Sequence, residues 1–125
     1  MIAGIGTDVV AIGRIRASLD RHGAAFAERI LAASEMVEYA QVHDQARFLA
    51  KRFAAKEAFS KAFGTGIRAP ATFHAIAVGH DELGKPFFVL GEVLAAEMEH
   101  RGWKSHLSIS DEKETVVAFA LIETI

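Results

Sequence analysis

The 125-residue sequence contains no cysteine, and this absence excludes several kinds of chemistry. Without cysteine the chain can form no disulfide framework, no cysteine-ligated zinc site and no thiol nucleophile. The first residues also lack the basic segment of a signal peptide, and Asp8 interrupts their apolar run, which argues against a membrane span. We therefore expect a cytoplasmic protein that does not enter a membrane.

An excess of charge of either sign is also missing. The formal net charge is −2 at pH 7, 51% of the residues are hydrophobic and 24% are charged. This balance is typical of a globular domain and argues against nucleic-acid binding through bulk positive charge. The sequence has no internal repeat, linker or low-complexity segment. Its length suits one domain with its own core, so we expect residues 1–125 to form a single domain.

The dominant feature is a long apolar segment at residues 47–66, RFLAKRFAAKEAFSKAFGTG. Its apolar residues point in almost every direction around a helix, and such a helix is normally internal. One flank carries an alanine every four residues, at Ala50, Ala54, Ala58 and Ala62. Asp44 is a suitable N-cap, and Gly64 suits the left-handed position that ends a helix. Charged side chains on an internal helix need partners.

The segments around this helix predict an α+β fold. Residues 2–12 have strand-forming residues that are apolar on both faces, so we expect an interior strand there. Helical patterns follow at residues 13–22 and after Gly23, and Ser34 is the predicted N-cap of a third helix. Later strands are predicted at 73–79, 86–90, 103–110 and 116–123, the last as an inner strand, with a helix at 91–101. We expect a mainly antiparallel sheet packed on the long central helix.

Three charged residues fall in segments that are predicted to be buried. Asp8 lies on the same face of the first strand as Gly4 and Gly6, which permit close approach of another element. Asp8 is either a structural cap or a ligand. Glu57 and Lys61 are spaced i,i+4 and can simply pair with each other. Alternatively, Asp8 and Glu57 converge on a magnesium ion and Lys61 neutralises an anion held there.

Positive charge also gathers on the first predicted helix. Arg14 and Arg21 point away from its apolar face and form either a solvated surface or a small cationic patch for an acidic partner. The glycine-rich turn at residues 64–66 lacks the full phosphate-loop motif, so it is a weak signal. His106 lies on a predicted strand, where a histidine is more often a surface residue than a ligand.

Five segments resemble the bacterial holo-[acyl-carrier-protein] synthases, in that family's order and over nearly the whole chain. They are GIGTDVV around Asp8, FAERIL at 26–31, RFAAKEAFSKAFGTGI at 52–67, GKP at 84–86 and HLSIS at 106–110. The resemblance implies the fold and activity of a 4′-phosphopantetheinyl transferase. Such an enzyme transfers the phosphopantetheine arm of coenzyme A to a serine of an apo acyl carrier protein and releases adenosine 3′,5′-bisphosphate.

The resemblance also implies roles for individual residues. The matches to Asp8 and Glu57 hold Mg²⁺ against the coenzyme A pyrophosphate, and the match to Lys61 contacts its phosphates. The residues implied to line the coenzyme A cleft are Arg52, Lys61, Gly64, Thr65, Lys85, Pro86, His106 and Ser108. The resemblance further implies a homotrimer with the cleft between neighbouring protomers. Members of the family dock an acidic carrier protein through a basic first helix, which here carries Arg14 and Arg21.

Glu57 and Lys61 are the catalytic candidates in this interpretation. Mg²⁺ and Lys61 would draw charge from the pyrophosphate and make the nucleotide a better leaving group. The carrier serine needs a base, for which Glu57 and a magnesium-bound water are the candidates. The water is favoured because a carboxylate that coordinates a metal is a weakened base. The alternatives are a non-catalytic carrier- or nucleotide-binding module of the same fold and a small magnesium-dependent nucleotide hydrolase.

Overall fold

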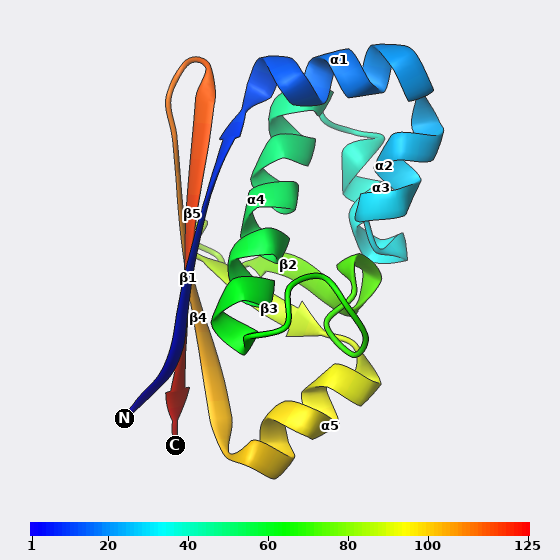
Figure 1. Ribbon diagram of the computed structural model, residues 1–125. Helices are drawn as coiled ribbons and strands as arrows, with labels where there is room; N and C mark the ends of the chain where they lie inside the picture. Colours follow the sequence, from blue (N-terminus) through cyan, green and yellow to red (C-terminus); the bar gives the residue numbers. More distant parts are fainter.

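A layer of helices covers one face of a twisted sheet in the computed structural model, which describes residues 1–125 (Figure 1). In chain order the elements are β1 (Ile2–Ala11), α1 (Ile12–His22), α2 (Ala24–Ile30), α3 (Ala33–Tyr39), α4 (Gln45–Phe63), η1 (Phe73–Ala75), β2 (Ile76–His80), β3 (Pro86–Leu90), α5 (Glu92–Arg101), β4 (Trp103–Asp111) and β5 (Thr115–Thr124). None of the helices has the combination of length and hydrophobicity that crossing a bilayer requires.

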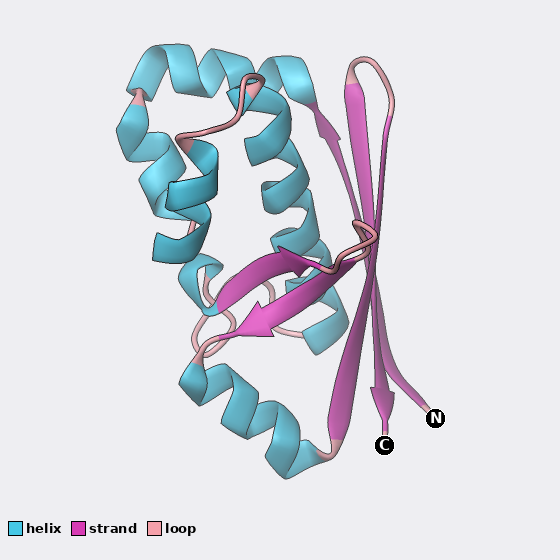
Figure 2. Cartoon of the chain, turned by 180° about the vertical axis from the view of Figure 1, so that it is seen from behind, coloured by secondary structure: helices cyan, strands magenta, loops and turns pink.

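The strands form two antiparallel sheets. One has three strands in the order β1-β5-β4, and the other is the β2–β3 hairpin. Figure 2 shows this hairpin crossing from the three-stranded sheet toward the helices. The prediction of an α+β fold with antiparallel strands on a long central helix is confirmed, except that two sheets replace the single one that was expected.

The position of β1 corrects a prediction. β1 is an edge strand, whereas β5 lies between β1 and β4 as predicted. The side of the sheet that faces away from α4 is also uncovered within the chain, so Ile5 is 60% exposed and Val9 65% exposed. Apolar residues on both faces of a strand indicated complete burial, but within one chain only the inner face is covered.

The ends of α4 form as the sequence predicts. The carboxylate of Asp44 accepts a hydrogen bond from the backbone N–H of Arg47 at 3.1 Å and caps the first turn. Gly64 ends the helix with φ of 102°, a left-handed value that favours glycine. Between these ends the helix is buried over most of its length, including Lys56 and Arg52.

The close approach of β1 to α4 depends on two glycines. A Cβ atom added at Gly4 would lie 1.9 Å from the carbonyl oxygen of Ala62, and one added at Gly6 would lie 2.1 Å from that of Ala58. Both distances are far shorter than any non-bonded contact, so side chains at these positions would push the strand off the helix. The alanine flank of α4 thus packs against the glycine face of β1, and this packing brings Asp8 to α4.

The third helix begins earlier than predicted. α3 starts at Ala33, so Ser34 lies inside the helix and is not its N-cap. The carboxylate of Glu35 supplies the capping interaction instead, because its Oε1 accepts a hydrogen bond from the N–H of Ala32 at 2.9 Å. This use of Glu35 places an acidic side chain in the interior, where it is 1% exposed.

Candidate functional site

Asp8 and Lys61 meet where β1 lies against α4. Nζ of Lys61 is 3.2 Å from Oδ1 of Asp8 and 3.0 Å from the carbonyl oxygen of Thr7. Glu57 lies one helical turn before Lys61, on the same side of α4. The lysine therefore pairs with the strand carboxylate, and the simple i,i+4 pair with Glu57 is not formed.

The surroundings of Glu57 disfavour its charged form. Burial raises the pKa of Glu57 above its ordinary value of 4.5, the negative charge of Asp8 raises it further, and Lys61 partly opposes both effects. Asp8 contributes to this shift because a like charge in the neighbourhood disfavours ionisation of a carboxyl group. A cation between like charges relieves such repulsion.

Asp8 also has an oxygen atom without a partner. Its side chain is 16% exposed, and Oδ2 is buried and accepts no hydrogen bond, whereas Oδ1 faces Lys61. An unpaired buried acceptor costs about 1–3 kcal/mol, and more when it is charged, so this atom is available to a ligand. No cluster of three or more histidine, aspartate and glutamate side chains could hold a metal. Two carboxylates with open coordination positions fit Mg²⁺, which usually keeps water and substrate oxygens in its shell.

A cavity of about 290 Å³ opens beside this site. Its lining includes Asp8 from β1, Arg14 and Ser18 from α1, and the rings of Phe26 and Phe53. Arg14 is exposed, as predicted, and shares the cavity with Asp8 because α1 follows β1 directly. A group held by Arg14 would therefore lie near Asp8. Arg21 is exposed in the last turn of α1.

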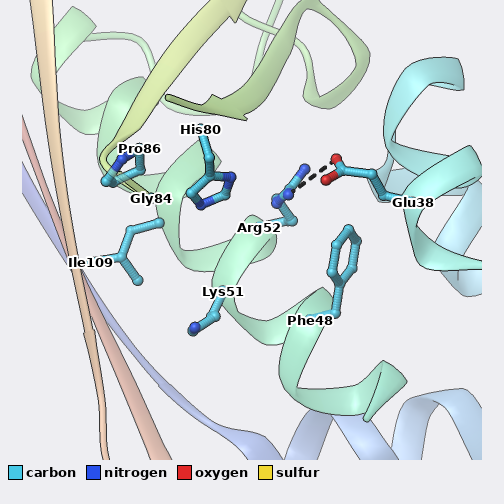
Figure 3. Close-up of a pocket in the computed structure, with 8 residues that line it drawn as sticks. All are labelled: Glu38, Phe48, Lys51, Arg52, His80, Gly84, Pro86 and Ile109. Atoms are coloured by element: carbon cyan, nitrogen blue, oxygen red, sulfur yellow. Dashed lines mark hydrogen bonds and ion pairs between the residues drawn. The ribbon is translucent and has the colours of Figure 1, made fainter. Parts of the chain in front are cut away.

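A second cavity, of about 440 Å³, lies on the other side of α4 (Figure 3). Arg52 lines it. Lys61 follows Arg52 by nine positions, which turn the helix through about 180°, so the two cations face opposite sides. Pro86 also lines this cavity, as does His80. Burial and the neighbouring Arg52 lower the pKa of His80 below 6.5. Lys85 is exposed in the β2–β3 loop.

A buried ion network behind Arg52 was missed at the level of sequence. Glu35 accepts hydrogen bonds from Nη1 of Arg52 at 3.0 Å and from Nζ of Lys56 at 2.5 Å. Lys56 also donates to the carbonyl oxygens of Ile30 at 2.7 Å and Phe73 at 2.9 Å, and it is 0% exposed. The available signal was a lysine next to alanines on a helix predicted to be internal, since such a charge needs a buried partner.

The turn after α4 uses its amides internally. The N–H groups of Gly64, Thr65 and Gly66 all donate to the carbonyl oxygen of Ser60, at 3.1, 3.3 and 3.1 Å. The hydroxyl of Thr65 donates to the carbonyl oxygen of Gly66 at 2.8 Å. These amides therefore complete the helix end and do not form an open phosphate cradle. A role for Gly64 and Thr65 in binding coenzyme A stays a prediction.

His106 and Ser108 lie on a third surface. Both are exposed on β4, where they alternate with Leu107, whose side chain is buried in the core. They therefore face away from α4. Nε2 of His106 contacts the carboxylate of Glu123 on β5. Most of the predicted site residues thus occupy three separate surfaces of one chain: the Asp8–Lys61 junction, the Arg52 cavity and the outer face of the sheet. Gly64 and Thr65 lie in the turn at the end of α4.

Comparison with known proteins identifies relatives over nearly the whole chain. Residues 4–120 match the family model of the 4′-phosphopantetheinyl transferase superfamily. A holo-[acyl-carrier-protein] synthase of Aromatoleum aromaticum is 63% identical over 123 residues, which cover 98% of each chain.

Solved structures show the same similarity. The crystal structure of holo-[acyl-carrier-protein] synthase from Neisseria meningitidis superposes with a TM-score of 0.96 at 50% identity and covers 99% of this chain and 100% of its own. A holo-(acyl-carrier-protein) synthase of Bacillus anthracis, solved in complex with CoA (3′,5′-ADP), gives a TM-score of 0.85 at 38% identity, with 100% of this chain and 99% of that one covered. The fold predicted from the sequence is thus that of its relatives.

Proposed function

Because the chain belongs to the 4′-phosphopantetheinyl transferase superfamily, as one of its holo-[acyl-carrier-protein] synthases, we propose that it transfers 4′-phosphopantetheine from coenzyme A to a serine of apo acyl carrier protein. The products are the holo carrier and adenosine 3′,5′-bisphosphate. The observation that carries the proposal is the buried, partnerless Oδ2 of Asp8 beside Glu57 and Lys61. A binding module of the same fold has no need of two mutually repelling carboxylates at this position.

Asp8 and Glu57 would hold the Mg²⁺ ion on which the reaction depends. When bound, this ion supplies electrostatic withdrawal of charge from the pyrophosphate. Lys61 is 51% exposed, so its ammonium group can also contact phosphate oxygens while it remains next to Asp8. It contributes a point charge that favours the departing nucleotide phosphate.

The transfer exchanges one phosphorus–oxygen bond for another. The serine oxygen of the carrier attacks the phosphorus that bears the pantetheine arm, and the bond from this phosphorus to the bridging oxygen breaks. The bridging oxygen leaves with the electron pair as part of adenosine 3′,5′-bisphosphate. The serine proton passes to a base. Glu57 is the chain's own candidate, although holding the ion would weaken it as a base.

The carrier protein is expected to dock on α1. Arg14 and Arg21 are exposed on this helix, and Arg14 borders the cavity that also contains Asp8. A carrier whose acidic residues bind these arginines would place its serine near the carboxylates. Electrostatic complementarity of this kind raises association rates and selects acidic partners.

We also infer a homotrimer with a coenzyme A cleft between neighbouring protomers. The outer face of the sheet exposes Ile5, Val9, Val117 and Phe119, four apolar side chains that are 38–65% exposed. Exposed apolar side chains on neighbouring strands are typical of a protein–protein interface. A cleft between copies can also bring together residues that one chain keeps apart, such as Asp8 and Arg52. The cytoplasmic location expected from the sequence stays a prediction.

Intact-mass analysis of the carrier tests the proposal. Incubation with coenzyme A, Mg²⁺ and an apo carrier should add the mass of phosphopantetheine to the carrier. Reactions without coenzyme A, or with a chelator, should add nothing. No mass gain would favour the non-catalytic binding module. Release of nucleotide from coenzyme A in the absence of carrier would instead indicate the hydrolase.

A further inference from the structure

The guanidinium group of Arg52 is fixed from its buried side. Its Nη1 donates to Oε2 of Glu35 at 3.0 Å and to the carbonyl oxygen of Val78 at 3.0 Å. Its central carbon lies 4.4 Å from the ring centroid of Phe48. The Arg52 side chain is 4% exposed and that of Glu35 is 1% exposed. These contacts hold the guanidinium in one position regardless of what enters the neighbouring cavity.

On the side that faces the cavity, the guanidinium group of Arg52 is held by a single exposed carboxylate. Nη2 of Arg52 donates to Oε2 of Glu38 at 3.2 Å, and the Glu38 side chain is 54% exposed (Figure 3). Glu38 is the only acidic residue among the eight that line the 440 Å³ cavity, which also contains Lys51 and His80. Glu38 is therefore paired with the guanidinium group of Arg52, one of the cations that an anion entering this cavity would meet.

We propose that Glu38 is a displaceable internal competitor for phosphate at Arg52. Arginine binds carboxylate and phosphate through the same kind of N–H group. Nη1 donates to Glu35 and Val78, so the donors left for an entering phosphate are on Nε and Nη2, and Glu38 already takes one N–H group of Nη2. Glu35 is confined by its burial, whereas Glu38 can rotate into water and give up a weak, exposed ion pair. A phosphate group of coenzyme A displaces Glu38, and the carboxylate thereby lowers the affinity of the enzyme for coenzyme A. This inference depends on the proposed function, in which Arg52 lines the coenzyme A cleft.

The variant Glu38→Gln isolates this effect because it removes the charge and keeps the size of the side chain. The dissociation constant for coenzyme A, measured calorimetrically, is expected to fall by about two- to five-fold, the range of an exposed ion pair. KM for coenzyme A should fall by the same factor while kcat stays unchanged, because Glu38 is displaced in the bound state and in the transition state alike. The matched control is Glu99→Gln. Glu99 is exposed on α5 and does not line the cavity, so this variant changes the net charge by the same amount and should leave both constants unchanged.

Two outcomes would overturn the inference, and a third variant separates it from the proposed function. If Glu38→Gln binds coenzyme A no more tightly than Glu99→Gln does, Glu38 does not compete with phosphate. Arg52→Lys keeps a buried cation beside Glu35 but loses the forked donor geometry, so it should weaken coenzyme A binding. If Arg52→Lys weakens coenzyme A binding and Glu38→Gln does not strengthen it, the proposed competition by Glu38 is wrong, but the assignment of Arg52 to the coenzyme A cleft is retained. If Arg52→Lys binds coenzyme A normally in a protein that melts normally, the cavity is not part of the cleft.

Discussion

Replacing Glu35 with glutamine removes the negative charge that two buried cations share. Lys56 is 0% exposed and Arg52 is 3% exposed, and both donate to the Glu35 carboxylate. The same carboxylate accepts the N–H groups of Ala32 and Val78, so it joins α3, α4 and β2. Glutamine preserves the volume but leaves the ammonium group of Lys56 buried without a counter-charge.

The structure allows the size of this effect to be approximated. Removing one partner from a buried ion pair costs about 3–5 kcal/mol, because the remaining charge is uncompensated. A domain of this size has a free energy of unfolding of about 5–15 kcal/mol, so the variant should still fold but lose a large part of that free energy. With roughly 3–5 °C per kcal/mol for a chain of this length, the melting temperature should fall by about 10–20 °C.

The loss should also depend on pH in a definite direction. Burial lowers the pKa of Lys56 from its ordinary value of 10.5, while the charge and hydrogen bond of Glu35 act to raise it. Without the Glu35 charge, the pKa of Lys56 falls further. Between the folded and unfolded pKa values the unfolded chain binds more protons, so stability rises with pH across that range. Glu35→Gln should therefore recover part of its lost stability as the pH approaches 10.5, and recover more than the parent protein.

Urea unfolding followed by circular dichroism, at one protomer concentration, measures these changes. Lys56→Met is the matched variant, and it should be milder because Glu35 keeps Arg52 and two backbone donors. The double variant should lose less stability than the sum of the single losses, because the unpaired lysine is gone. A loss below about 1 kcal/mol in Glu35→Gln, or strict additivity, would refute the assignment of Glu35 as the counter-charge of Lys56.

Three further predictions concern the packing of β1, the carboxylate site and carrier docking. Gly6→Ala should destabilise the protein by about 3 kcal/mol in thermal unfolding, because its Cβ would lie 2.1 Å from a carbonyl oxygen of α4. The control Gly13→Ala should leave stability unchanged, because no atom lies within 4 Å of the added Cβ. Binding of Mg²⁺ should weaken as the pH decreases through the raised pKa of Glu57, because protonation removes the charge of a ligand. Glu57→Gln should lose Mg²⁺-dependent turnover but keep its melting temperature, and a Mg²⁺ titration like that of the parent would contradict its metal role. Arg14→Glu should raise KM for the carrier about ten-fold and leave the affinity for coenzyme A nearly unchanged. The control Lys113→Glu changes an exposed lysine and should not raise KM for the carrier. Equal losses for both substrates in Arg14→Glu would contradict docking on α1.

The site was only partly predictable because its residues depend on contacts of different range. Asp8 and Glu57 could be proposed as partners because glycines on one face of β1 and alanines along α4 are both visible as local patterns. The pairing of Lys61 with Asp8 in place of Glu57 could not be read from spacing, since both partners were within plausible reach. Glu38 at the rim of the Arg52 cavity had no sequence signal at all.

The sequence by itself determined the features that short-range chemistry controls. Asp44 and Gly64 define the ends of α4 through capping and a left-handed backbone, and periodicity identifies most helices and strands. Only the tertiary structure decided that β1 is an edge strand, that Glu35 lies beneath Arg52 and Lys56, and that most of the predicted binding residues lie on three surfaces. The physical reason is that strand order and ion pairing depend on distances between segments far apart in the chain, and the pattern within any one segment does not specify those distances.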